Sequence, residues 1–178
     1  DAVKRMRGKP GTKVTISVVR EGWTEPKDFD ITREQIRVQS VRSADLGGGV
    51  AYVKLRQFQE QSPGDMAAAL DKSSKAGMKA LILDLRNNPG GYVNEAVGVA
   101  SQFVGDGTVY QSVDASGVEK DVPVQAGGLA TSIPLVVLTD GGTASSAEIV
   151  TGAIQDAGRG KVVGDKTFGT GTVLGRFD

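Results

Sequence analysis

Two adjacent serines follow a strongly apolar stretch of this 178-residue chain, in a segment rich in glycine and hydroxyl residues. The segment reads TDGGTASSAE and runs from Thr139 to Glu148, with Ser145 and Ser146 at the expected start of a helix. A helix N-terminus offers unpaired N–H groups and a positive potential, which suit a developing oxyanion. A serine placed there is a candidate nucleophile, although Ser, Thr and Asp are also ordinary N-cap residues. The segment therefore needs a partner before it indicates catalysis.

A second glycine turn supplies part of that partner. It reads DLRNNPGG, from Asp84 to Gly91, and it also follows an apolar run. Paired glycines leave backbone N–H groups unobstructed, and sites in open α/β sheets form just beyond the carboxyl ends of strands. We expect the two turns to face one another, one supplying a nucleophile and the other an oxyanion donor. Taken alone, NPGG is also a plain turn.

The composition restricts the remaining catalytic groups. The chain has no histidine and no cysteine, which excludes an imidazole base, a thiol nucleophile and a thiolate zinc site within these residues. A hydrolase here needs another base, and lysine is the first choice. We expect no metal and no cofactor. The 21 basic and 21 acidic residues give zero net charge, so bulk charge selects neither nucleic acid nor an anionic membrane as a partner.

These groups must be positioned by strands and helices, which the apolar pattern locates. Two continuous apolar runs, Ala80 to Leu85 and Pro134 to Thr139, have the length of strands that are buried on both faces. Buried strands that alternate with helices predict an α/β layered fold. The predicted helices run from Ser62 to Gly77, from Asn94 to Val104 and from Ser145 to Ala157.

The N-terminal part of the chain has a different pattern. Residues 1–8 predict the end of a helix, with Val3 and Met6 on one face, and a hairpin-like pair of extended segments follows it. No apolar run approaches the roughly 20 residues of a membrane span. A new unit is expected to begin after this region. Its first strands are predicted at 35–41 and 50–55.

Three blocks of the chain resemble consecutive blocks of the C-terminal processing, or tail-specific, serine protease family. They are AVKRMRGKPGTKVTISVVREG, DLRNNPGG and LTDGGTASSAEIVTGAIQDAGRGKVVGDKTFGTGTV, in the family's order and spacing. The resemblance implies the C-terminal part of a PDZ domain over residues 1–34, where the helix with Val3 and Met6 lines a peptide groove. It implies a layered ClpP/crotonase-like protease core over residues 35–178, incomplete at its C-terminus. It also implies polypeptide substrates with accessible C-termini and an extracytoplasmic location, periplasmic or in the cell envelope, and it allows a homo-oligomer.

The resemblance also assigns roles within the two turns. Matching the family's GSASASE pattern to residues 142–148 implies that Ser145 is the nucleophile, with Ser146 as the competing choice on spacing alone. The backbone N–H groups of Gly91 and Ser146 are then implied as the oxyanion hole. Glu148 is expected to be an ordinary first-turn acid without a catalytic role.

The chain departs from this family at the general base. The family usually has FGKG followed by VQ, with the lysine as base and the glutamine as its orienting partner, whereas here Thr170 and Leu174 occupy those positions. A threonine hydroxyl cannot take the serine proton as an amine can. Lys166 is the nearest lysine, but four residues of extended chain put it roughly 13 Å from Thr170. Lys161 is farther along the chain still.

Three functions remain open on these grounds. The first is a serine endopeptidase that cleaves proteins near their C-termini, with slow or absent turnover because its usual base is missing. The second is a catalytically silent relative that keeps the scaffold for peptide binding or assembly, as Thr170 and Leu174 suggest. The third, an acyl-CoA enzyme of the crotonase type, has no use for a serine at the head of a helix.

Overall fold

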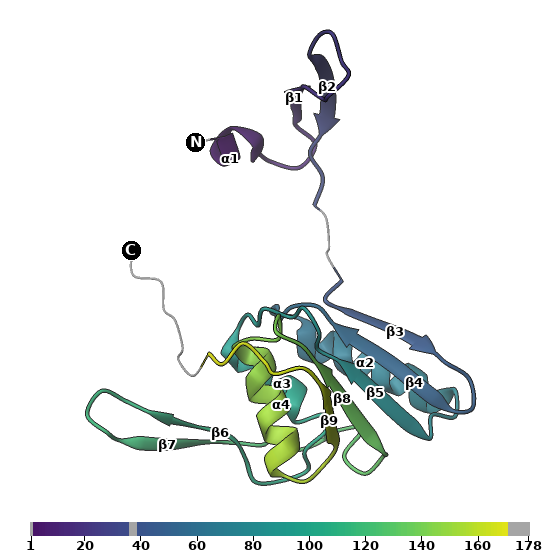
Figure 1. Ribbon diagram of the computed structural model, residues 1–178, viewed down its shortest axis with the longest axis vertical. Helices are drawn as coiled ribbons and strands as arrows, with labels where there is room; N and C mark the ends of the chain where they lie inside the picture. The colour runs from purple at the N-terminus through teal and green to yellow at the C-terminus, as the bar shows by residue number, and fades with distance from the viewer. Residues whose placement is uncertain (1, 36–38, 171–178) are drawn as a thin grey trace. The chain divides into compact units, whose positions relative to one another are not determined.

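The computed structural model describes residues 2–35 and 39–170 of the chain, which divides into two units, Asp1–Val38 and Gln39–Asp178. Figure 1 labels the helices and strands of both. Within the described ranges, no helix has the length and apolar character needed to cross a membrane. Each unit forms its own β-structure.

The first unit is a short helix followed by a hairpin, as the N-terminal pattern predicts. Helix α1 is Ala2–Met6, and strand β1 (Lys13–Val18) pairs antiparallel with β2 (Lys27–Thr32). The Arg33 guanidinium ties the helix to the hairpin because its Nε donates to the Met6 carbonyl oxygen at 2.8 Å. The side chains of Val3 and Met6 are exposed. Their role in peptide binding, and the assignment of this unit to a PDZ domain, stay predictions.

The second unit contains a five-stranded sheet. Its strands are β3 (Val41–Asp45), β4 (Val50–Leu55), β5 (Ala80–Asp84), β8 (Leu135–Thr139) and β9 (Lys161–Gly164). They lie in the order β3-β4-β5-β8-β9, and only β3 is antiparallel to its neighbour. The two apolar runs of the sequence are the adjacent central strands β5 and β8, with Asp84 opposite Leu138. Both glycine turns therefore leave the sheet at the same edge.

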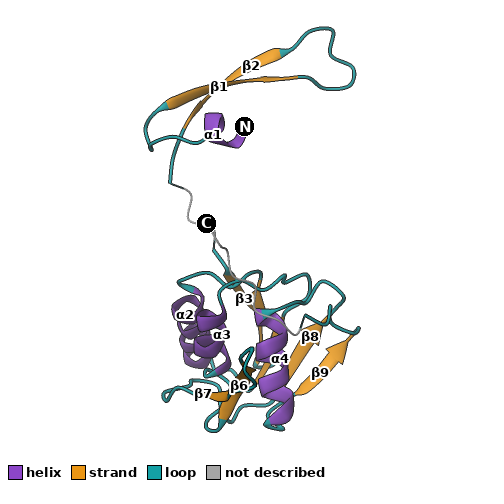
Figure 2. Cartoon of the chain, turned by 90° about the vertical axis from the view of Figure 1, so that its left-hand side faces the viewer, coloured by secondary structure: helices purple, strands orange, loops and turns teal. Residues whose placement is uncertain are grey.

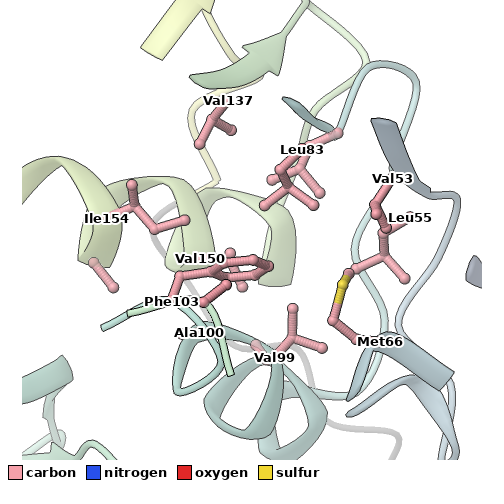
Figure 3. Close-up of a cluster of buried hydrophobic side chains, with 14 of the residues drawn as sticks. Val53, Leu55, Met66, Leu83, Val99, Ala100, Phe103, Val137, Val150 and Ile154 are labelled. Atoms are coloured by element: carbon pink, nitrogen blue, oxygen red, sulfur yellow. The ribbon is translucent and has the colours of Figure 1, made fainter. Parts of the chain in front are cut away.

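Three helices cover one face of this sheet, as Figure 2 shows. They are α2 (Ser62–Lys75), α3 (Val93–Ala100) and α4 (Ser146–Asp156). The hydrophobic core lies between the two layers, where Leu83 and Val137 from the sheet gather with Phe103 and Ile154 (Figure 3). All four side chains are completely buried. The α/β layered fold predicted from the sequence is confirmed.

One predicted strand differs from the structure. The strand expected at 35–41 is misplaced, because β3 begins at Val41, and residues 36–38 lie outside the described residues. The extent of β3 is set by its pairing with β4, which runs from Val41 opposite Leu55 to Asp45 opposite Ala51. A 2.9 Å bond from the Leu46 N–H to the Val50 carbonyl oxygen closes the turn between the two strands. Between α3 and β8, a hairpin formed by β6 (Thr108–Val113) and β7 (Glu119–Pro123) extends from the second unit in Figure 1.

Candidate active site

Ser145 is held in an unfavourable backbone conformation immediately before α4. Its φ is 54° and its ψ is −121°, a combination that residues with a side chain rarely adopt. In the described ranges the other non-glycine residue with a positive φ is Asn87, at 57°, which lies in the Asp84–Gly91 turn. Such conformations cost on the order of 1–3 kcal/mol each and persist only where the surrounding contacts impose them. The structure therefore stores strain in both turns that the sequence singled out.

Gly90 and Gly91 bring the second turn close to Ser145. A Cβ atom on Gly90 would lie 2.7 Å from the Ser145 Cβ atom and 3.0 Å from the Ser146 backbone nitrogen. A Cβ atom on Gly91 would lie 2.1 Å from the Phe58 carbonyl oxygen. The φ angles of 93° and 144° also favour glycine at both positions. The two turns thus face one another, with Gly91, Ser145 and Ser146 brought together.

Four hydrogen bonds join the two turns. They run from the Asn87 N–H to Asp140 Oδ1 (2.8 Å), from the Ala144 N–H to the Asn88 carbonyl oxygen (2.9 Å), from the Thr143 hydroxyl to the Leu85 carbonyl oxygen (2.9 Å) and from the Ser146 hydroxyl to the Gly91 carbonyl oxygen (2.9 Å). The bond from Asn87 is the main reason why the pKa of Asp140 lies below its usual value. Each turn is consequently fixed by the other.

Asn88 and Phe58 attach the glycine turn to the rest of the unit. The buried Asn88 amide donates to the Leu55 carbonyl oxygen at 3.0 Å, and its Oδ1 accepts from the Gly90 N–H at 2.9 Å. The Phe58 N–H donates to the Gly90 carbonyl oxygen at 2.9 Å, and its carbonyl oxygen accepts from the Tyr92 N–H at 3.1 Å. Because the Phe58 ring is buried in the core, the turn is anchored to the core by its backbone.

Two backbone N–H groups beside Ser145 are left without a partner. Those of Gly91 and Ser146 donate to no acceptor in the part of the chain that the structure describes, although the groups around them are bonded. Ser146 is the first residue of α4, so its N–H also carries the positive potential of the helix N-terminus. Two free donors next to a strained serine form an arrangement that can stabilise negative charge on a carbonyl oxygen.

A buried carboxylate supports the start of the glycine turn. Asp84 is completely buried and accepts hydrogen bonds from Arg86 Nε at 3.0 Å, from Arg86 Nη2 at 2.9 Å and from Lys54 Nζ at 3.2 Å. The Tyr52 hydroxyl also donates to it. Burial alone would raise the pKa of Asp84, but the bonds from Arg86 and Tyr52 outweigh it and hold the pKa far below its usual range. This network was not predicted from the sequence, because Tyr52 and Lys54 come from the adjacent strand β4 and meet Asp84 only once the two strands pair.

Glu148 connects the start of α4 to the segment that follows β9. Its Oε2 accepts from the N–H groups of Ser145, at 2.7 Å, and Thr170, at 2.9 Å, and its Oε1 accepts from the Gly169 N–H at 2.6 Å. Burial would raise the pKa of Glu148, but these bonds and one from the Thr167 hydroxyl lower it. The expectation of an ordinary first-turn acid was too narrow, because the carboxylate also binds a second segment of the chain.

Thr170 and Lys166 both lie around Glu148, but neither forms a bond with the Ser145 hydroxyl in the part of the chain that the structure describes. In the described ranges no side chain forms a hydrogen bond with the Ser145 hydroxyl. Thr170 reaches Glu148 through its backbone. Lys166 lines a pocket of about 310 Å³ together with Glu148, Gly152 and Gln155 of α4.

Neither Lys161 nor Leu174, the position of the family's glutamine, adds a described catalytic group to the site. Lys161 is the first residue of β9 and is exposed. Leu174 lies outside the described residues. The roles predicted for Ser145, Gly91, Ser146, Thr170 and Lys166 stay predictions, but the first four lie in one place.

Comparisons with known proteins point to a family of peptidases. The model of peptidase family S41 matches residues 49–178. The carboxyl-terminal-processing protease of Synechocystis sp. is 37% identical over 183 residues, which cover 100% of this chain and 42% of that protein. The carboxy-terminal-processing protease of Bartonella bacilliformis is 37% identical over 180 residues, which cover 97% and 41%.

A solved structure is also similar over most of the chain. The photosystem II D1 C-terminal processing protease matches with a TM-score of 0.69 and 28% identity, over 91% of this chain and 46% of that one. The chain thus spans less than half the length of each of these relatives. Since the family model covers most of the second unit, including both turns, the chain belongs to peptidase family S41.

Proposed function

We propose that the protein is a serine endopeptidase that cleaves polypeptides near their C-termini, with Ser145 as the nucleophile. One observation carries the proposal above the others. The strained Ser145 lies beside two unpartnered N–H groups, those of Gly91 and Ser146, at the carboxyl edge of a parallel sheet. Family membership supports a peptide bond as the target. The competing assignment of Ser146 as nucleophile is disfavoured, because its hydroxyl donates to the Gly91 carbonyl oxygen.

The proposed chemistry is acyl transfer in two steps. The Ser145 hydroxyl oxygen attacks the carbonyl carbon of the scissile bond, while its proton passes to a base. The carbonyl oxygen becomes an oxyanion that accepts from the Gly91 and Ser146 N–H groups, and one such donor contributes on the order of 10²–10³ in rate. The C–N bond then breaks, and the leaving amine takes up a proton. Water hydrolyses the resulting ester and restores the Ser145 hydroxyl.

The proton acceptor is the incomplete part of this scheme. Thr170 lies where the family's lysine is expected, and its hydroxyl holds its proton near neutral pH. Lys166 is the alternative base, and it shares a pocket with Glu148, but no bond joins it to the Ser145 hydroxyl in the described residues. Loss of general-base help costs on the order of 10²–10⁴ in rate, so we expect slow turnover unless a base comes from another part of the protein.

A catalytically silent relative that binds peptides or acts as a scaffold is the second candidate function. It is favoured by one observation, the threonine at position 170. In that case the strained turn and the free N–H groups would bind a peptide carbonyl without cleaving the chain. Both functions place polypeptides with accessible C-termini at this site, and both fit the extracytoplasmic location that the family resemblance implies. Fractionation of cells that produce the protein would test the location.

The two functions are separated by covalent chemistry at Ser145. The intact protein, a Ser145→Ala variant and a Ser146→Ala variant are incubated with an unstructured polypeptide and with a fluorophosphonate probe. We expect slow cleavage and labelling that Ser145→Ala abolishes. Cleavage that depends on Ser145 would rule out the silent scaffold. Absence of both cleavage and labelling would rule out the protease. Loss of labelling with Ser146→Ala alone would show that Ser146, rather than Ser145, is the nucleophile.

A further inference from the structure

Two aromatic side chains of the second unit stand out because they are exposed. In its described part, Phe58 and Phe103 are buried and the two tyrosines of the sheet and hairpin are partly buried. Tyr92 is 65% exposed and Phe168 is 72% exposed. An aromatic side chain left in water forgoes a large apolar burial, and aromatic residues are the most frequent anchors of binding sites. These two rings therefore need an explanation that the core does not supply.

Both exposed rings are attached to the turns around Ser145. Tyr92 directly follows Gly91, and its N–H donates to the Phe58 carbonyl oxygen at 3.1 Å. The Phe168 N–H donates to the Thr143 carbonyl oxygen at 2.9 Å, two residues before Ser145. The main chain at both positions is thus fixed by the same contacts that form the site. The main chain therefore places Tyr92 next to Gly91, whose N–H is free in the described residues, and Phe168 two residues before Thr170.

We propose that Tyr92 and Phe168 determine the specificity of the Ser145 site by binding apolar side chains on the two sides of the scissile bond. The inference rests on the proposed function. The carbonyl oxygen of the bond must lie at the Gly91 and Ser146 N–H groups, so the side chain of the acyl residue lies next to Tyr92. The leaving residue lies on the other side of the bond, toward the segment that carries Thr170, so its side chain lies next to Phe168.

The chemistry of the two rings defines the class of substrate. Each ring offers an apolar surface, and the Glu148 carboxylate is already occupied by the Ser145, Gly169 and Thr170 N–H groups. An apolar or aromatic side chain gains by covering such a ring, whereas a charged side chain loses hydration without gaining a partner. The preferred sequence therefore has apolar residues on both sides of the bond.

Binding to the uncleaving Ser145→Ala form of the intact protein tests this inference apart from turnover. The ligands are peptides with identical termini that differ at the two central positions, which are either both leucine, or aspartate on the acyl side, or aspartate on the leaving side. We expect the dileucine peptide to bind about tenfold more tightly than either aspartate peptide. Because the three peptides have the same termini, any recognition of a C-terminus elsewhere in the protein contributes equally to their three affinities.

Variants assign each ring to its side. Tyr92→Ala should weaken the dileucine peptide about fivefold to tenfold and remove the penalty of aspartate on the acyl side, and Phe168→Ala should do the same for the leaving side. Tyr92→Phe and Phe168→Leu should restore most of the affinity. Leu129→Ala is the matched control, since Leu129 is 51% exposed but precedes β8, at the end of that strand opposite to Ser145.

The outcomes separate this inference from the proposed function. Equal affinities for the three peptides, or ring variants that bind the dileucine peptide as the parent does, would overturn the specificity assignment even if Ser145 cleaves. Selective binding that the two ring variants abolish would establish it even if no cleavage is detected. In that second case the endopeptidase is wrong and the silent peptide-binding function is favoured.

Discussion

The two halves of the candidate site differ in how they are built. The oxyanion half, residues 84–91 with the start of α4, rests on the buried side chains of Asp84 and Asn88 and on the core residue Phe58. The base half, residues 165–170, is mostly exposed and is held by its backbone N–H groups, which donate to Glu148 and Thr143. Side chains are thus fixed by packing in the first half, whereas the second half is held mainly by its backbone. The proposed oxyanion geometry therefore does not depend on which side chain occupies position 170.

The largest effect is expected from completing the base half. Thr170→Lys places an amine where the family's lysine is expected, and the Glu148 bond to the residue 170 N–H needs no side chain to form. We expect the rate of peptide cleavage to rise by about 10²–10⁴. Steady-state kinetics of the intact protein measure the gain, with Thr108→Lys on an exposed strand as the control. A gain that survives Ser145→Ala would show that another residue attacks.

The next largest effect concerns the close contact in the oxyanion half. Gly91→Ala puts a Cβ atom 2.1 Å from the Phe58 carbonyl oxygen at a φ of 144°, so the turn or the core must move. We expect a loss of about 3 kcal/mol or more in the free energy of unfolding, measured by urea denaturation. Gly152→Ala is the matched control, because that helix position has open space and should gain up to about 1 kcal/mol. Equal effects of the two substitutions would refute the close packing.

The buried carboxylate of the oxyanion half gives a third test. Asp84→Asn removes the charge that binds Arg86 and Lys54, and both cations are partly exposed, so water limits the penalty. We expect a loss of about 2–3 kcal/mol in the free energy of unfolding. Asp71→Asn breaks the exposed ion pair with Lys75 and should cost below about 0.5 kcal/mol. Thermal and urea denaturation distinguish the two.

The smallest effect is expected at the residue that joins the halves. Glu148→Gln keeps one acceptor oxygen and loses the charge, so about 1–2 kcal/mol of stability should be lost at neutral pH. The folded pKa of Glu148 is lowered, so its contribution is complete above the unfolded pKa of about 4.3 and disappears as the pH falls through the folded pKa. The difference between parent and variant in urea denaturation should therefore shrink on acidification. A difference that grows instead would reverse the assigned direction of the pKa.

The sequence was sufficient for the parts of the molecule that local patterns specify. The strands β5 and β8 are continuous apolar runs of strand length, and glycine and hydroxyl residues after them indicate turns, so the edge of the sheet with Ser145 and Gly91 could be located. The resemblance to the S41 peptidases rests on these same turns and is confirmed by the family match. Helix α3 ends at Ala100 rather than Val104, because helix ends depend on contacts that periodicity does not report.

The contacts between distant segments could not be found in the sequence. The sequence places Asn88 in what could be a plain turn. In the structure its amide nitrogen donates to the Leu55 carbonyl oxygen and its Oδ1 accepts from the Gly90 N–H. Glu148 was predicted only as a first-turn acid, yet its carboxylate also accepts from the backbone N–H groups of Gly169 and Thr170. Bonds from a side chain to a backbone group far along the chain leave no pattern in residue type or spacing. The bond between Lys54 and Asp84 could not be predicted either, because it depends on the register in which the adjacent strands β4 and β5 pair.

The attachment of the glycine turn to Phe58 has a consequence for how the protein opens. The Phe58 N–H and carbonyl oxygen bracket residues 90–92, and the Phe58 ring is locked in the core, so this turn separates from α4 only when the core loosens. Amide hydrogen exchange at Phe58 and Tyr92 should then require the same large opening as the central strands, whereas the Gly169 and Thr170 amides should exchange through local fraying. Slowly and rapidly exchanging amide hydrogens would then lie within one site. The surface proposed to receive the carbonyl group would then be as durable as the fold itself, and the segment proposed to carry the base would open independently.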